Sequence, residues 1–382
     1  MGYSPAVDEV QLAERLIGYD TSRRADLRLA MDFASGWLEA RDIAVEKRDV
    51  GGREALCARV GAGPVRIVLH GHMDVVPGHP EQFAPRIEAG RLYGRGAYDM
   101  KGALAAMMLA LADVAPGCPG VEVQLLVTPD EERGDPGANT TEMLVEQGLR
   151  ADFVVCGEPT DLQVGVQAKG VLMMRVHVCG RAAHGSTPWL GHNAVLEAVD
   201  TFRAIEGLPF AAESTSLFAR PSINLGRILG GDAVNKVPDF CRMDVDVRYL
   251  PGQDPAEILR QVGSLGPAEV EVLLERPPAY VPPDHPMVLA LLEAVGRHEP
   301  AVASIGRDGA SDAVAFLSVG VPAIEFGPRG AGHHGPDEHV EVASLATYRR
   351  ALGDFLRAVS RDAMTAEAAA PAPIASPSPE AA

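Results

Sequence analysis

The chain has 382 residues, of which 47% are hydrophobic and 23% charged, and its formal net charge is −18. This length suits two domains, and the acidity disfavours proteins that bind nucleic acid or anionic membranes through basic patches. No apolar run reaches the ~18 residues of a membrane span, and the first residues lack the pattern of a secretory signal. The 5 cysteines are widely spaced, which favours reduced thiols. We therefore expect a cytoplasmic protein with no nucleic-acid or membrane partner.

The first part of the chain alternates short apolar runs with a helical pattern. We predict a helix at residues 100–114 and buried strands at residues 65–70, 121–128 and 153–156. Such alternation is typical of an α/β domain, and open α/β sheets hold their sites at strand ends.

The region from residue 171 to 279 has a different pattern, in which strands alternate polar and apolar residues. This pattern predicts a sheet with one covered face, and therefore a separate α+β unit. Its expected strands are residues 171–180, 221–231, 240–252 and 268–275, and its expected helices are residues 192–206 and 255–262.

A proline cluster, RPPAYVPPDHP, ends this unit. After it we predict a helix at 287–298, a strand at 322–327 and a helix at 343–360. Residues 362–382 are rich in alanine and proline and are predicted to form a disordered tail.

Histidines and carboxylates recur where apolar runs end, at the expected junctions of strands and loops. Such side chains are the ligands that a pair of divalent metal ions needs. A metal pair in turn indicates attack of metal-bound water on an amide or similar carbonyl. The candidates are His72, Asp74, Asp99, Glu131, Glu132, Glu158 and His334.

His72 and Asp74 share one face of an extended segment. His72 can therefore bind a metal while Asp74 hydrogen-bonds the other ring nitrogen. A turn histidine capped by an aspartate is the alternative, and an isolated H-x-D pair favours it. His70 competes for the ligand role, but Asp74 follows His72 and favours the latter.

The other carboxylates have similar alternatives. Asp99 precedes a predicted helix, so it is either an N-cap or a carboxylate that bridges two metals. Glu131 and Glu132 point to opposite sides of an extended chain, so one can bind metal while the other accepts a proton from water. An exposed acidic turn is the alternative for that pair. Glu158, in a tight turn, is either exposed or a ligand.

Two histidines lie in glycine-containing loops. His334 is either a ligand or part of an exposed polar loop, and His333 beside it is the alternative ligand. His184 belongs to the separate α+β unit, so a metal ligand there would have to cross domains. Contact with substrate or stabilisation of an oxyanion is favoured for His184 over metal binding, and an ordinary loop histidine is the alternative.

Taken together, these sequence segments resemble those of the di-zinc amidohydrolase and peptidase superfamily. This superfamily contains acetylornithine deacetylase, succinyl-diaminopimelate desuccinylase, aminoacylase and carboxypeptidase G. The resemblance covers nearly the whole chain except its tail. It rests on the segments GHMDVVP, GRGAYDMKGA, TPDEERG, GEPT, GRAAHGS, GGDAVNKVPD, GASDA and HGPDEHV, which occur in the family's order.

The resemblance implies a metal site with two zinc ions per chain, for which cobalt or manganese are alternatives. His72 and Glu158 would hold one ion and Glu132 and His334 the other, with Asp99 and a water or hydroxide bridging them. Two Zn²⁺ ions, three carboxylates and one hydroxide sum to a neutral core, which is easier to bury than a net charge.

The resemblance also assigns the catalytic roles. Glu131 would be the general base and would later protonate the leaving amine, while Asp74 would orient His72. His184 would reach the partner subunit's site and stabilise the oxyanion. Asn235 and Arg248 match positions that bind the substrate's carboxylate or help to close the lid.

The same resemblance implies a discontinuous catalytic domain, residues 1–170 and 280–361, with a mixed central sheet flanked by helices. Residues 171–279 would form an inserted dimerisation and lid domain, so that the protein would be a homodimer.

Three functions remain in competition. The first is hydrolysis of an N-acyl amino acid, as in a deacetylase or desuccinylase, and the second is cleavage of a short peptide by a carboxypeptidase or dipeptidase. A non-catalytic binding protein is the third, and the presence of Glu131 with the full ligand set argues against it. The missing dinucleotide fingerprint disfavours a nucleotide-dependent enzyme.

Overall fold

An eight-stranded mixed sheet forms the centre of the larger domain in this computed structural model, which describes residues 8–132, 139–266 and 269–369. Strands β5, β2, β6 and β14 of this sheet run parallel to one another, so their carboxyl ends lie at one edge. The strands are β1 (Ala44–Val50), β2 (Arg53–His72), β5 (Pro119–Thr128), β6 (Phe153–Cys156), β7 (Val164–Ala168), β12 (Ala279–Tyr280), β13 (Ser304–Arg307) and β14 (Ala323–Glu325).

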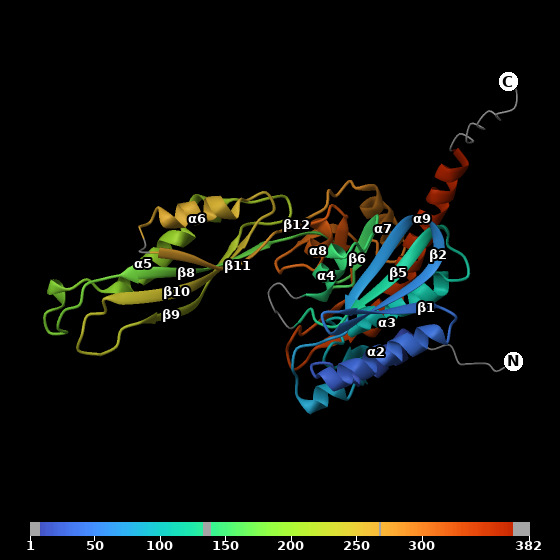
Figure 1. Ribbon diagram of the computed structural model, residues 1–382, viewed down its shortest axis with the longest axis horizontal. Coiled ribbons are helices and arrows are strands. Elements are labelled where there is room, and N and C mark those ends of the chain that lie inside the picture. Colours follow the sequence, from blue (N-terminus) through green and yellow to red (C-terminus); the bar gives the residue numbers. More distant parts are fainter. Residues whose placement is uncertain (1–7, 133–138, 267–268, 370–382) are drawn as a thin grey trace, which may run out of the picture.

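Helices cover both faces of this sheet (Figure 1). Strand β2 shows why, because Ile67 and Leu69 join one hydrophobic core while Val68 between them joins the other. Helices α4 (Thr140–Glu146) and α8 (Ala313–Leu317) contribute to the smaller core. The larger core is completed by α1 (Glu9–Ile17), α2 (Arg24–Glu39), α3 (Lys101–Val114), α7 (Pro286–Gly296) and α9 (Val342–Ala369).

A small four-stranded sheet joins two segments that are far apart in the chain. Its order is β15 (Gly330–Ala331), β16 (His339–Glu341), β4 (Arg91–Tyr93) and β3 (Arg86–Glu88). The pairing of β16 with β4 places the loop between β15 and β16 beside the segment that leads into α3.

The second domain stands to one side of the first and has an antiparallel sheet of its own (Figure 1). The sheet order is β11 (Glu269–Arg276), β8 (Gly170–Cys179), β10 (Phe240–Tyr249) and β9 (Ser222–Gly230). Helices α5 (Ala194–Glu206) and α6 (Pro255–Gly263) pack on one face, where every second residue of β8 and β10 is buried. We call this domain the insert.

The predicted α/β class with a mixed central sheet is confirmed, and most predicted elements occur within a few residues of their expected bounds. The elements that were not predicted include helices α1, α2, α4 and α8, strands β1, β7 and β13, and the strands of the small sheet. The amphipathic spacing of Leu12, Leu16 and Ile17, all buried, is a signal that would have found α1.

The predicted disordered tail is wrong for residues 362–369, because α9 continues to Ala369. Alanine is the strongest helix former, the first proline comes only at Pro371, and Ala363 packs against the main core. Residues 370–382 lie outside the described residues. Within the described part of the chain, no helix combines the length and apolar character required to span a membrane.

Candidate active site

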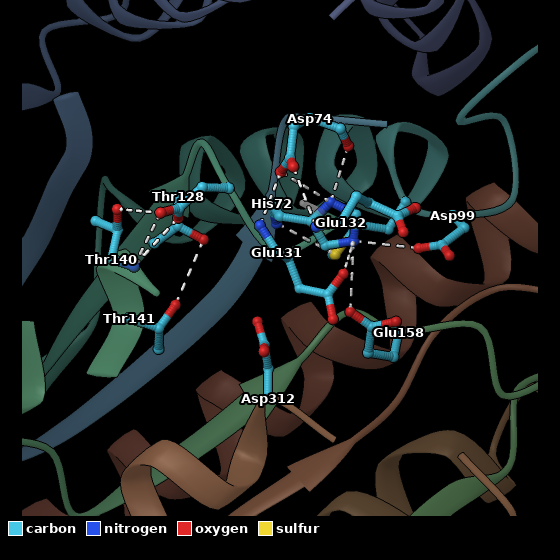
Figure 2. Close-up of polar contacts among 12 residues, drawn as sticks. His72, Asp74, Asp99, Thr128, Glu131, Glu132, Thr140, Thr141, Glu158 and Asp312 are labelled. Atoms are coloured by element: carbon cyan, nitrogen blue, oxygen red, sulfur yellow. Dashed lines mark hydrogen bonds and ion pairs between the residues drawn. The ribbon is translucent and has the colours of Figure 1, made fainter. Parts of the chain in front are cut away.

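The carboxyl ends of three parallel strands bring most of the candidate ligands together (Figure 2). His72 is the last residue of β2, and its backbone pairs with Thr128, the last residue of β5. The turn after β5 carries Glu131 and Glu132, and the turn after β6 carries Glu158. The parallel register thus places one histidine and three carboxylates at a single edge of the sheet.

Asp99 and His334 reach this edge through the small sheet rather than through the central one. A buried residue, Glu338, accepts hydrogen bonds from the backbone N–H groups of Tyr98 and Asp99, both at 3.1 Å. Its other carboxylate oxygen lies 2.6 Å from Nη1 of Arg95. Arg95 in turn donates to the backbone oxygen of His334 at 3.0 Å. Glu338 and Arg95, which the sequence interpretation missed, therefore fix Asp99 relative to His334.

The two oxygens of Asp99 face different partners. Oδ1 lies 3.2 Å from Nε2 of His72, whereas Oδ2 lies 2.5 Å from Nε2 of His333 and 3.4 Å from Nε2 of His334. Nε2 of His334 also lies 3.0 Å from Oε1 of Glu132. Asp99 thus stands between two groups of ligand-type side chains.

Three sets of side chains have ligand atoms within 4.8 Å of one another. They are Asp99, His333 and His334; His72, Asp99 and Glu158; and His72, Glu131 and Glu132. His333, the sequence alternative to His334, belongs to the first of these sets. His334 has a positive φ of 58°, an uncommon conformation for a residue other than glycine and one that clusters at functional sites.

Asp74 contacts His72 through different atoms from those expected. Nδ1 of His72 is 2.9 Å from the backbone oxygen of Asp74, while the carboxylate Oδ1 is 3.6 Å away. The predicted hydrogen bond to the carboxylate is therefore wrong. The carboxylate instead accepts the backbone N–H groups of Glu131 and Glu132, both at 3.1 Å, and so holds their turn in place.

The buried charges of the cluster fit divalent cations. Oε1 of Glu158 is buried and has no hydrogen-bond partner among the described residues. Burial, reinforced by the charge of Asp99, raises the pKa of Glu158 well above its usual value. Carboxylates crowded in this way, together with imidazoles, form a donor set for zinc, cobalt or manganese.

The histidines show the complementary effect. Although burial favours a neutral ring, the neighbouring carboxylates of Asp74 and Asp99 raise the pKa of His72 well above its usual value. Burial would likewise raise the pKa of Asp99, but its hydrogen bonds with His333, His334 and His72 hold it well below the usual value. Protons and metal ions therefore compete for the same atoms.

Glu131 combines burial with neighbouring negative charge. Burial first, and then the charge of Asp312, raise the pKa of Glu131 well above its usual value. Figure 2 shows the carboxyl groups of Glu131, Glu158 and Asp312 turned toward one another. Burial also raises the pKa of Asp312 to about 7. A carboxyl group with a raised pKa suits proton transfer near neutral pH.

A cleft of about 220 Å³ opens beside Glu131, between the two domains. The insert contributes one wall of the cleft, and the larger domain contributes the opposite one. Besides Glu131, the residues from the larger domain are Asn139, Glu142, Ala310, Ser311, Asp312, Val314 and Ala315. Arg248 belongs to the wall of the insert and pairs with Asp246 on its own strand at 3.0 Å. Concave sites with mostly apolar walls and a few polar groups are typical of small-molecule binding.

The other two candidates of the insert lie apart from this cleft. His184 is exposed and shares a 2.7 Å hydrogen bond with Ser186 through Nδ1. Gly185 donates from its backbone to the backbone oxygen of the exposed Asn235 at 2.7 Å. Among the described contacts, none joins His184 or Asn235 to the metal-ligand cluster of the same chain.

Comparison with known proteins identifies the family of this chain. Residues 68–358 match the Peptidase family M20/M25/M40, and the chain belongs to this family of hydrolases. It is 29% identical to an acetylornithine deacetylase of Proteus mirabilis, with 85% of this chain and 88% of that protein covered. It is 31% identical to a succinyl-diaminopimelate desuccinylase of Caulobacter vibrioides, with 91% and 96% covered.

The fold is similar to that of a solved Bacillus subtilis protein described as a dinuclear metal-binding peptidase of the M20 family. The TM-score is 0.67 at 15% identity, over 92% of this chain and 98% of that one.

Proposed function

We propose that this protein hydrolyses the amide bond of N-acyl amino acids and that it does so with two divalent metal ions, zinc in the first place. The observation that carries the proposal is the position of Asp99, with one oxygen toward His72 and the other toward His334. The two relatives named above are a deacetylase and a desuccinylase, which favours removal of an acyl group over cleavage of a peptide.

The residues that would hold the metal ions follow from the same geometry. His72 and Glu158 would hold one ion, Glu132 and His334 the other, and Asp99 would bridge them. The contact between His334 and Glu132 favours His334 over His333 as the ligand. When bound, the ions would polarise the amide carbonyl and supply a nucleophilic water at neutral pH.

The proton transfers are assigned to Glu131. In this proposal its carboxylate accepts a proton from the attacking water and then donates it to the departing amine. Asp74 keeps Glu131 in position through the backbone of the turn. Arg248, on the opposite wall of the cleft, binds the carboxylate of the amino-acid part of the substrate.

We further propose a homodimer that forms through the insert. More than half of the exposed large apolar side chains among the described residues belong to this domain, including Trp189, Leu190, Leu196 and Val234. Strand β9 is an edge strand, whose free backbone suits pairing with a second copy. Exposed apolar surface of this kind marks an interaction site. The dimer would bring His184 and Asn235 to the partner subunit's cleft.

The test is elemental analysis of purified protein, combined with hydrolysis assays on N-acetyl amino acids, N-succinyl amino acids and dipeptides. We expect about two metal ions per chain and hydrolysis that a chelator abolishes and zinc restores. His334→Ala should lower the metal content more than the neighbouring His333→Ala. A protein that stays metal-free after reconstitution, or one that prefers dipeptides to every N-acyl amino acid, would contradict the proposal.

A further inference from the structure

The wall of the cleft opposite Glu131 carries a second guanidinium group. Arg276, the last residue of β11, lines the cleft together with Arg248. Its Nη1 forms an ion pair with Oε1 of Glu142 on α4, which belongs to the larger domain. This pair therefore crosses from the insert to the larger domain at the side of the cleft.

The backbone of Arg276 is firmly placed. It pairs with Val171 of β8, and its carbonyl oxygen accepts a hydrogen bond of 3.0 Å from the hydroxyl group of Tyr249. Tyr249 is buried and packs closely on Gly170, where a Cβ atom would lie only 2.3 Å from the ring. The guanidinium of Arg276 is therefore presented to the cleft from a rigid base.

The ion pair of Arg276 is easier to replace than that of Arg248. Arg248 is held by three hydrogen bonds to both oxygens of Asp246 on the same strand. Arg276 has one hydrogen bond to Glu142 among the described side-chain contacts, and both side chains are about one-third exposed. Partly exposed pairs contribute little stability, and a guanidinium has donors for a full carboxylate.

The same pair separates two spaces. Arg276 and Glu142 line the cleft beside Glu131 and also a neighbouring cavity of about 360 Å³. A longer acyl group that extends away from Glu131 would meet Arg276 at the boundary between the two spaces.

We propose that Arg276 is a specificity residue that binds the terminal carboxylate of a dicarboxylic acyl group, such as N-succinyl, in place of Glu142. The inference rests on the proposed function and makes the preferred substrates N-succinyl rather than N-acetyl amino acids. A carboxylate and a guanidinium form two parallel hydrogen bonds, which selects for this group by geometry as well as charge.

The reaction itself is not altered by this contact. Water adds its oxygen to the amide carbon, the C–N bond breaks, and the amine leaves with a proton. The products are a free amino acid and a dicarboxylate whose distal group has stayed on Arg276. Because Arg276 acts on an atom remote from the bond that breaks, it is a positioning and specificity residue.

The experiment compares N-acetyl-L-ornithine and N-succinyl-L-ornithine, which differ only in the acyl group, on the metal-loaded enzyme. Arg276→Gln should lower kcat/KM for the succinyl substrate about 10- to 100-fold more than for the acetyl substrate. Arg276→Lys should restore part of that difference. Glu142→Gln, which removes the competing carboxylate, should lower KM for the succinyl substrate.

Arg260→Gln is the matched control, because Arg260 forms a similar pair with Glu257 on the outside of the same domain. It should leave the ratio of the two kcat/KM values unchanged. An equal loss on both substrates in Arg276→Gln would overturn the inference and show that the ion pair only joins the domains. A wild-type preference for the acetyl substrate would also overturn it.

Calorimetric binding of succinate and acetate separates this inference from the proposed function. Succinate should bind the wild-type enzyme more tightly than acetate, and Arg276→Gln should abolish the difference. This result would support Arg276 even if neither substrate were hydrolysed, in which case the proposed function alone would fail. Equal binding of the two ions to the wild type would overturn the role of Arg276.

Discussion

The two domains hold their candidate functional residues in opposite ways. In the larger domain most of the candidate ligands follow buried parallel strands, and their side chains contact one another, with His72 fully buried and Asp99 only 5% exposed. In the insert, His184 and Asn235 are exposed, and their two loops contact each other. The first arrangement is organised within one chain, whereas the proposed role of the second requires another surface to cover it.

Because of this difference, a substitution in the larger domain should have a local effect, whereas the effect of one in the insert should depend on assembly of the subunits. Side chains at the ends of β2, β5 and β6 are placed by the register of a buried sheet, which an isolated chain already provides. Those of the insert are placed by loops on an apolar surface that is exposed in the single chain. Variants in the two domains should therefore behave differently when subunits are mixed.

The largest effect is expected for Glu131→Gln. The amide keeps the size of the side chain but cannot accept a proton, so turnover should fall by about 10²–10⁴-fold. The metal content should stay at its wild-type value, because His72, Asp99, Glu132, Glu158 and His334 are intact. Steady-state kinetics and elemental analysis of the same preparation check both points. Activity equal to that of the wild type would refute the role of Glu131.

His184→Ala should lower turnover by about 10²–10³-fold, the range for loss of one oxyanion donor, without loss of metal. The decisive measurement is a mixture of this variant with Glu131→Gln. If His184 acts on the partner subunit's site, mixed dimers contain one complete site and activity returns. If mixing restores nothing although dimers form and exchange, His184 does not act across the interface.

Much of the central sheet follows from local patterns in the sequence. The apolar run that ends at His72 and the run that ends at Thr128 are buried strands, and α3 begins two residues after Asp99. The spacing of apolar residues follows from which side chains are buried, so buried strands and helices are predictable from it. The position of the candidate ligands at the strand ends was predictable for the same reason.

The features that the sequence did not predict depend on contacts between distant segments. Glu338 and Arg95 meet only because β16 pairs with β4, and nothing local in either segment indicates that pairing. The hydrogen bond from the backbone of Glu131 to the Asp74 carboxylate also joins segments that are distant in the sequence. Arg276 and Glu142 belong to different domains, so no spacing in the sequence could join them. The homodimer and the cytoplasmic location stay predictions.

Glu338→Gln tests how strongly these distant contacts support the ligands. Loss of the charge leaves the buried Arg95 without its ion-pair partner and weakens the hold on the backbone of Asp99. We expect metal affinity to fall about 10- to 100-fold, the usual range for groups that orient ligands. Competition with a chelating dye measures it. Glu341→Gln, at a half-buried neighbouring position, serves as control, and an equal loss there would contradict the assignment.

The smallest effect concerns His70, which is buried next to the ligands. Burial lowers the pKa of His70 from its usual 6.5 to about 3. Between these two values the unfolded chain binds a proton that the folded chain does not, so stability is lost as the pH falls. From pH 7 to pH 5 this loss should be about 2 kcal/mol, and His70→Asn should lack it.

Denaturant unfolding of both proteins at the two pH values, in the presence of chelator, measures the difference. Loss of the contact between His70 and Thr141 changes the stability of His70→Asn at both pH values, so only the change with pH is diagnostic. His192→Asn, at an exposed position of the insert, is the matched control. A pH-dependent difference of similar size in that variant would show that burial at the strand end is not its cause.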